Sequence, residues 1–190
     1  MTGDGTRRFP DRSAWEKWLA ANHAAADGIW IKFARKDSGI RTISHEVALE
    51  VALSYGWIDG LGRKFDEDFW LLRFTPRRPQ SKWSKINRDK AVELIKTGKM
   101  KPAGLREVER AKADGRWEAA YPGSRAATVP DDLQRELDKN ERARKFFATL
   151  NSQNRYAILY RIHEAKKPET RSRRIDKFVA MLNDQQKIYP

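Results

Sequence analysis

The sequence contains no cysteine, and this absence excludes several kinds of chemistry. The chain can form no disulfide framework, no cysteine nucleophile and no thiolate metal site. Its three histidines, His23, His45 and His163, lie far apart and match neither HExxH nor HxH spacing. We therefore expect no metal site.

Long apolar runs are absent as well. No window approaches the roughly 18 consecutive apolar residues of a membrane-spanning helix. The first residues, MTGDGTRRFPDRSAW, lack the apolar core of a signal peptide. The sequence therefore predicts a cytoplasmic protein without a membrane span.

Common cofactor and nucleophile motifs are missing too. The stretch DGLGRK supplies Gly60 and Gly62 but not the third glycine of a dinucleotide-binding turn. TGKMKPAG has Met100 where a phosphate-binding loop needs serine or threonine, and no GxSxG occurs. We expect no cofactor, and these motifs leave open whether the chain is an enzyme.

What the chain does contain is enough apolar and aromatic surface to fold, together with a large positive charge. Its 190 residues include seven tryptophans, and 39% are hydrophobic. This length suits one ordinary domain, or a domain with a helical appendage. A formal net charge of +13 favours phosphate-rich or acidic partners, nucleic acid among them, unless it forms only a basic, solvated surface.

The first half of the chain predicts a small sheet with helices. The first eight residues read as a loose polar tail. A helix begins at Asp11 or Ser13 and ends at Gly28, a strand covers 29–35, and Ser44 caps a second helix. WIDGLGRKFDEDFWLLRFTP then has the pattern of a β-hairpin with RKFDED at its tip. We expect an α+β fold, with a small antiparallel sheet of about three strands packed on helices.

The second half of the chain is predicted to be helical. One helix is capped by Ser84 or Asn87 and ends at Gly98, and another runs from Pro102 to Gly115. WEAAYPGSRAATVP has the composition of a connection. Further helices are expected over 131–139, over 141–163 with a break near 151–154, and over 168–183. We divide the chain into an α+β domain, 9–120, and a helical C-terminal subdomain, 130–187.

The most one-sided charge in the chain lies between residues 71 and 90. One anion, Asp89, stands there among seven cations: Arg73, Arg77, Arg78, Lys82, Lys85, Arg88 and Lys90. Forked guanidinium groups, hydroxyls and an indole beside a helix start can bind an anionic ligand. The predicted ligand-binding residues are Arg73, Arg77, Arg78, Ser81, Trp83, Ser84 and Asn87. Alternatively, the arginines form a solvated loop, Trp83 fills the core and Ser84 only caps a helix.

Asp59 is the one candidate for acid–base catalysis. A hairpin centred on Asp66 places Asp59 directly opposite Arg73 on one face of the sheet. In that arrangement the carboxylate orients the Arg73 guanidinium, or else it serves as a general acid or base if it lies in a concave site.

A second basic stretch, AKKPETRSRR, carries Lys166, Lys167, Arg171, Arg173 and Arg174. Pro168 followed by Glu169 is an ordinary helix start, so a solvated helix face explains these charges. The alternative is a surface for nucleic acid. The chain shows no helix-turn-helix, zinc-finger or RNP signature of a sequence-specific reader.

Four motifs occur together, in order, along nearly the whole chain: ALSYGWIDG, RFTPRRPQSKWSKIN, GKMKPAGLREVERAKADGRW and AKKPETRSRRI. In this combination the sequence resembles the YdeI or OmpD-associated family, the bacteriocin-protection proteins of bacteria. It departs from that resemblance at Ser54, where cysteine is expected in many members. The resemblance implies a role in tolerance of bacteriocins and envelope stress, and it implies no particular reaction. Its signature positions include Gly56, Trp57, Asp59, Gly60 and Pro76 beside the predicted ligand-binding residues.

Three functional hypotheses follow. The first is a non-enzymatic stress-protection protein that binds an anionic small molecule or an acidic partner through the charge-dense segment. The second is sequence-independent binding of nucleic acid by the basic surface. The third is an uncharacterised enzyme that uses Asp59 as its acid or base.

Overall fold

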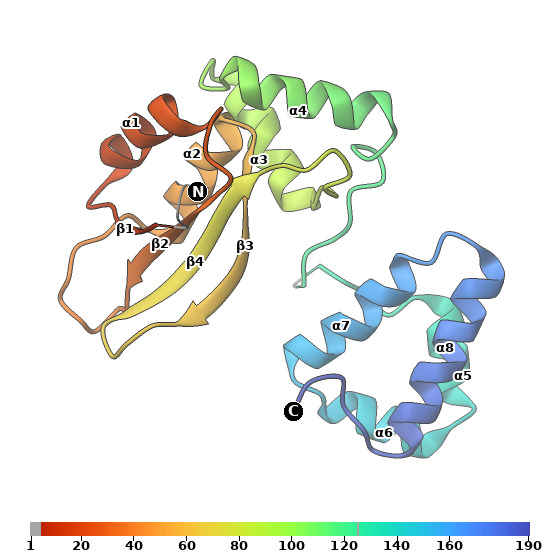
Figure 1. Cartoon of the computed structure of the whole chain (residues 1–190). Helices are drawn as coiled ribbons and strands as arrows, with labels where there is room; N and C mark the ends of the chain where they lie inside the picture. The colour runs from red at the N-terminus through yellow and green to blue at the C-terminus, as the bar shows by residue number, and fades with distance from the viewer. Residues whose placement is uncertain (1–4, 125) are drawn as a thin grey trace. The chain divides into compact units, whose positions relative to one another are not determined.

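The computed structural model describes residues 5–124 and 126–190 (Figure 1). The chain divides between Ala120 and Tyr121 into two compact units. The described residues of the first unit form four strands and four helices, and those of the second form four helices. The α+β fold and the helical C-terminal part are thus confirmed.

The sheet differs from the prediction in strand number and direction. Its strands are β1 (Thr6–Arg8), β2 (Ile29–Ala34), β3 (Trp57–Lys64) and β4 (Phe69–Pro76), in the order β1-β2-β4-β3. β1 runs parallel to β2, while the other two pairings are antiparallel. The sheet is therefore mixed and four-stranded rather than antiparallel with about three strands. Thr6–Arg8 was expected to belong to a loose tail, and the rest of that tail, residues 1–4, lies outside the described residues.

The first unit carries α1 (Arg12–Asn22), α2 (His45–Ser54), α3 (Lys85–Lys96) and α4 (Pro102–Ala113). Asp11, Ser44 and Ser84 each accept a backbone N–H from the first turn of the helix that follows, as N-caps do. α1 ends at Asn22, six residues before the predicted stop at Gly28. α3 and α4 end just before Gly98 and Gly115, both of which have positive φ.

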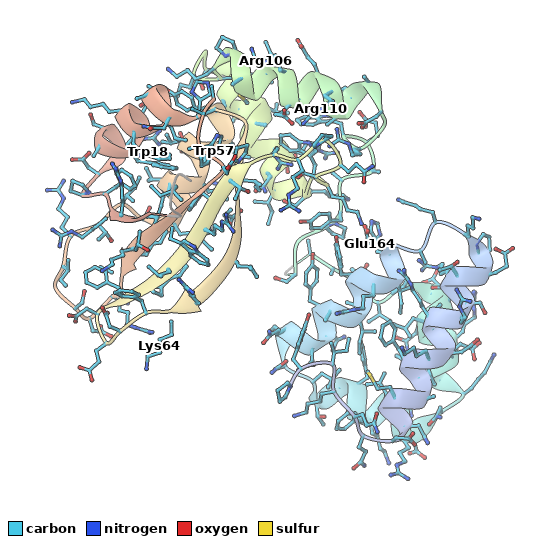
Figure 2. The ribbon with its side chains drawn as sticks, viewed as in Figure 1. Trp18, Trp57, Lys64, Arg106, Arg110 and Glu164 are labelled. Carbon is cyan, nitrogen blue, oxygen red and sulfur yellow. The ribbon has the colours of Figure 1, made fainter. Side chains whose placement is uncertain are left out.

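Aromatic side chains dominate the core between the sheet and the first two helices. Trp15 is fully buried and its indole N–H donates to the Ala48 carbonyl at 3.0 Å. Trp18 and Trp57, both labelled in Figure 2, meet edge to face, and their ring centroids are 5.7 Å apart. This core fixes β3 and β4 against α1 and α2. Lys64 lies at the far end of β3, where Figure 2 shows it pointing away from the body of this unit.

The second unit consists of α5 (Asp131–Asp138), α6 (Glu141–Thr149), α7 (Ser152–His163) and α8 (Pro168–Asn183). The predicted break near 151–154 is real: Asn151 caps α7 by accepting the Asn154 N–H at 2.9 Å. Apolar residues of all four helices form one core, which includes Leu133, Ile158 and Phe178. Nothing in the described part of the chain is long and apolar enough, as a helix, to cross a membrane.

Candidate functional site

The charge-dense segment comprises the end of β4, an ordered loop and the start of α3. The Arg78 N–H donates to Ser81 Oγ at 3.0 Å, and the Ser81 N–H donates back to the Arg78 carbonyl at 2.9 Å. Ser84 Oγ accepts the Asn87 N–H at 3.1 Å and begins α3. The loop therefore has a defined shape before any ligand arrives. We call residues Arg77–Asn87 the cationic loop.

Arg77 and Trp83 hold the cationic loop to the core of the first unit. The Arg77 guanidinium lies 3.7 Å from the centre of the Trp83 ring, and its Nη1 donates to the Lys82 carbonyl at 3.2 Å. Trp83 is 2% exposed and packs edge to face on Trp117 at 5.0 Å. With so little exposed surface, the indole has no open face on which a ligand could stack. Ligand binding by these two residues stays a prediction, while their packing role is visible.

The other cations of the charge-dense segment differ in how they are compensated. Lys90 pairs with Glu46 at 3.2 Å, and Arg88 lies 3.5 Å from Asp89. Arg78 and Lys85 are exposed, and within residues 5–124 and 126–190 neither has an ion-pair partner. These two side chains are therefore available to an anion in solvent. Ser81 and Asn87 are half-buried beside them.

An arginine that sequence reasoning missed also supports the loop. Arg116 Nη1 donates to the Ser81 carbonyl at 2.6 Å, and its Nε donates to both carboxylate oxygens of Asp114 at 2.8 Å. The bond from Arg116 lowers the pKa of Asp114 below its usual value, although burial opposes this. Arg116 thus joins the loop to the end of α4. It lies 35 residues from Ser81, so no local pattern could have indicated the contact.

The predicted pairing of Asp59 with Arg73 is wrong. The hairpin register shifts between Asp59 and Gly62, so Asp59 lies opposite Phe74. Such a bulge adds one residue to one strand and exchanges the faces that follow it. Arg73 instead lies opposite Trp30 of β2 and is half-buried.

Asp59 has a different partner, His45, the first residue of α2. His45 Nε2 and Asp59 Oδ2 are 2.9 Å apart, and the two side chains are 44% and 25% exposed. The His45 ring also lies 6.3 Å from the ring centres of Phe33 and Trp70. A carboxylate bonded to one ring nitrogen orients the imidazole. The acid–base role of Asp59 stays a prediction, now with His45 as its partner.

The second basic stretch has two of its five cations engaged within its own unit. Arg171 donates to Asp132 through Nε and Nη2 and to the Ile162 carbonyl through Nη1 at 3.0 Å. Arg174 donates to the Arg161 carbonyl. Lys166, Lys167 and Arg173 are exposed. The surface left for nucleic acid is therefore smaller than the sequence suggested.

Two family models match the chain in separate places. A domain of unknown function (DUF8412) matches residues 7–107, which is more than half of the chain. The family described as bacteriocin-protection, YdeI or OmpD-associated matches residues 126–185. The motifs GWIDG and RFTPRRPQSKWSKIN lie in the first match, and AKKPETRSRRI lies in the second.

Neither the curated proteins nor the solved structures contain a match to this chain. The family models are therefore the comparisons that bear on its identity. Each family model lies within one compact unit: the match over 7–107 lies in the first unit, and the match over 126–185 lies in the second. The chain belongs to the DUF8412 family, whose model covers more than half of it, and its second unit is similar to the bacteriocin-protection, YdeI or OmpD-associated family.

Proposed function

We propose that the protein is a stress- or bacteriocin-protection protein that binds an anionic ligand or an acidic partner through its cationic loop, without catalysing a reaction. The observation that carries this proposal is the exposure of Arg78 and Lys85 without an ion-pair partner among the described residues. Both lie in the cationic loop, whose backbone is already ordered by Ser81 and Ser84. The description of the family that matches residues 126–185 supplies the protective role.

Preorganisation makes this loop suited to binding. Arg77 and Arg116 donate to the backbone carbonyls of Lys82 and Ser81 and so hold the loop from two sides. A ligand then has to immobilise only the exposed side chains, and the entropic cost of binding falls. Arg78 offers a forked guanidinium that matches a carboxylate or phosphate, and Lys85 adds a point charge.

The experiment compares two double variants in a titration with inorganic phosphate, a nucleotide, an acidic peptide and a single-stranded oligonucleotide. Arg78→Ala with Lys85→Ala removes the two available charges. Arg35→Ala with Lys17→Ala removes the same charges from exposed sites outside the loop. We expect the first pair to weaken binding by roughly 3- to 30-fold, as two exposed charge contacts would. The control pair should change the free energy of binding by less than half as much as the first pair does.

Equal losses from both pairs would contradict the proposal and would favour a diffuse basic surface. Repeating the oligonucleotide titration at several salt concentrations tests nucleic-acid binding. Each phosphate contact that a variant loses should reduce the magnitude of the slope of log K against log salt by about one. An anion that is bound and chemically changed would establish catalysis and overturn the non-enzymatic part of the proposal.

A further inference from the structure

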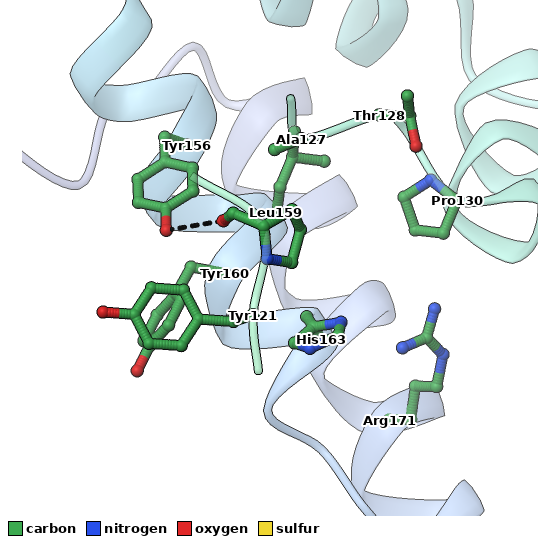
Figure 3. A pocket seen from close by; sticks show the side chains of 10 residues that line it. Tyr121, Ala127, Thr128, Pro130, Tyr156, Leu159, Tyr160, His163 and Arg171 are labelled. Atoms are coloured by element: carbon green, nitrogen blue, oxygen red, sulfur yellow. Dashed lines mark hydrogen bonds between the residues drawn. The ribbon is translucent and has the colours of Figure 1, made fainter. Parts of the chain in front are cut away.

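The second unit contains a small cavity that plays no part in the function proposed above. Its volume is about 150 Å³, and it lies between the segment that leads into α5 and one side of α7, with Arg171 of α8 in its wall. Figure 3 shows tyrosines 121, 156 and 160 on one side of this cavity and Arg171 on the other. Ala127 and Leu159 lie between them in that view.

Three aromatic rings form the tyrosine side of the wall. Tyr156 and Tyr160 are four residues apart and therefore share one face of α7. Their ring centres are 5.9 Å apart, and Tyr121 meets Tyr160 edge to face at 5.0 Å. The Tyr156 hydroxyl donates to the Pro122 carbonyl at 3.1 Å and holds the leading segment against the helix. The wall is thus fixed from both sides, as a binding site requires.

Arg171 is the one lysine or arginine among the residues that line this cavity, and its charge is balanced; His163 also lines it. Asp132 compensates the charge of Arg171 through two hydrogen bonds. Burial raises the pKa of Tyr156 to about 12 and also raises the pKa of Tyr160, so both phenols keep their protons. A carboxylate ligand would gain little from an arginine that is already paired, and it would approach the Asp132 carboxylate.

Hydrogen-bond donors nevertheless remain. A guanidinium has five N–H groups. Arg171 uses one at Nε, one at Nη1 and one at Nη2, so two have no partner in the described part of the chain. An uncharged acceptor such as an amide carbonyl or a phenol oxygen can accept from them without bringing in a second charge.

From this geometry we infer that the cavity binds a small, uncharged, single-ring aromatic molecule with a hydrogen-bond acceptor, of the class of aromatic amides and phenols. The volume suits one ring, because an engineered protein cavity of roughly this size, about 150 Å³, binds benzene. The ring packs against the tyrosines, whose faces and edges favour aromatic partners. The acceptor binds the two remaining N–H groups of Arg171. This site lies in the second unit, so its test is independent of the cationic loop.

The test uses benzamide as the probe on the full chain, with binding measured by ligand-observed NMR titration. Cyclohexanecarboxamide, of similar size but without a ring π-system, and benzoate, which is charged, are the comparison probes. We expect benzamide to bind at least about tenfold more tightly than either. Contacts between benzamide protons and tyrosine ring protons should appear in nuclear Overhauser spectra.

Variants locate the site. Ala127→Leu places three more carbon atoms in the cavity and should abolish benzamide binding, while Ala180→Leu, at an exposed position of α8, should leave it unchanged. If Ala127→Leu unfolds the second unit, the Overhauser contacts on the unaltered protein still decide. The inference is overturned by undetectable benzamide binding, by tighter binding of benzoate, by contacts that avoid the tyrosines, or by a folded Ala127→Leu protein that binds normally.

Discussion

Gly104 of α4 lies against the last turn of α2, and its replacement gives a sharp test of the fold. A Cβ atom built on Gly104 would lie 2.7 Å from the Leu53 carbonyl oxygen and closer still to that of Ser54. Both carbonyls belong to the last turn of α2, and the Lys101 N–H donates to the second of them at 3.1 Å. Carbonyl oxygens of the backbone cannot rotate aside as a flexible side chain can. Gly104→Ala therefore has to push α4 away from α2.

The size of the effect follows from opposing contributions. Ordinary contact begins at 3.4 Å, so α4 has to move by at least 0.7 Å from the Leu53 oxygen alone. Overpacking of this kind costs about 1–3 kcal/mol, and weakening the Lys101 hydrogen bond costs about 1 kcal/mol more. Alanine returns about 1 kcal/mol because it favours helix more than glycine does. We expect Gly104→Ala to lower the free energy of unfolding by about 1–3 kcal/mol.

The assay is urea unfolding followed by tryptophan fluorescence. All seven tryptophans precede Ala120, so the signal reports on the first unit alone. Gly115→Ala is the matched control, since its Cβ would meet nothing within 4 Å and its φ of +77° costs only about 1–2 kcal/mol of backbone strain. If Gly104→Ala is as stable as the wild type, or more stable through its helix propensity, the close approach of α2 and α4 is refuted.

Three further changes test other parts of the structure. Arg77→Ala removes the guanidinium from the Trp83 ring and should lower the free energy of unfolding of the first unit by about 1–3 kcal/mol. Arg78 is exposed, so Arg78→Ala should change that free energy by less than about 0.5 kcal/mol. The same fluorescence assay compares the two variants. The hydrogen bond from Arg171 lowers the pKa of Asp132 in the folded protein. The Asp132 carboxylate therefore stabilises the second unit at pH values above its unfolded pKa of about 3.8. This stabilisation disappears as the pH falls through the lower pKa of the folded state. Circular dichroism of Asp132→Asn at neutral pH should therefore show a less stable helical unit, with less further loss in acid than the wild type shows; equal acid sensitivity would contradict this. Asn154 is 1% exposed, and both its side-chain oxygen and its nitrogen form hydrogen bonds with the backbone of Tyr189. Asn154→Ala should therefore lower the free energy of unfolding by about 1–3 kcal/mol, measured by thermal unfolding. An unchanged stability would refute the contact.

Sequence reasoning located most helices because their signals are local. Ser44 and Ser84 cap helices within three residues of themselves, and Pro102 begins one. The apolar spacing in the C-terminal half likewise repeats every three to four residues, so three helical stretches, one with a break, could be placed with small errors at their ends. The hairpin was recognisable for the same reason, since its two strands flank one polar turn.

The sheet and the details of the candidate site could not be obtained in this way. Strand β1 has only three residues, TRR, and no apolar pattern that would predict a strand. It forms because it pairs with the edge of β2, more than twenty residues later in the chain. The bulge after Asp59 depends on how β3 meets β4, and a shift of one residue gave this carboxylate His45 as its partner instead of Arg73.

The sequence by itself determined the composition of the charge-dense segment, the helix that follows it and the family resemblance carried by its motifs. Only the tertiary structure decided which of its cations face solvent: Arg77 is buried on Trp83, while its neighbour Arg78 is exposed. The physical reason is that helix caps and periodicity arise from interactions within one turn of chain. Burial and ion pairing depend instead on residues far away in the sequence, such as Glu46 beside Lys90 and Arg116 on the cationic loop.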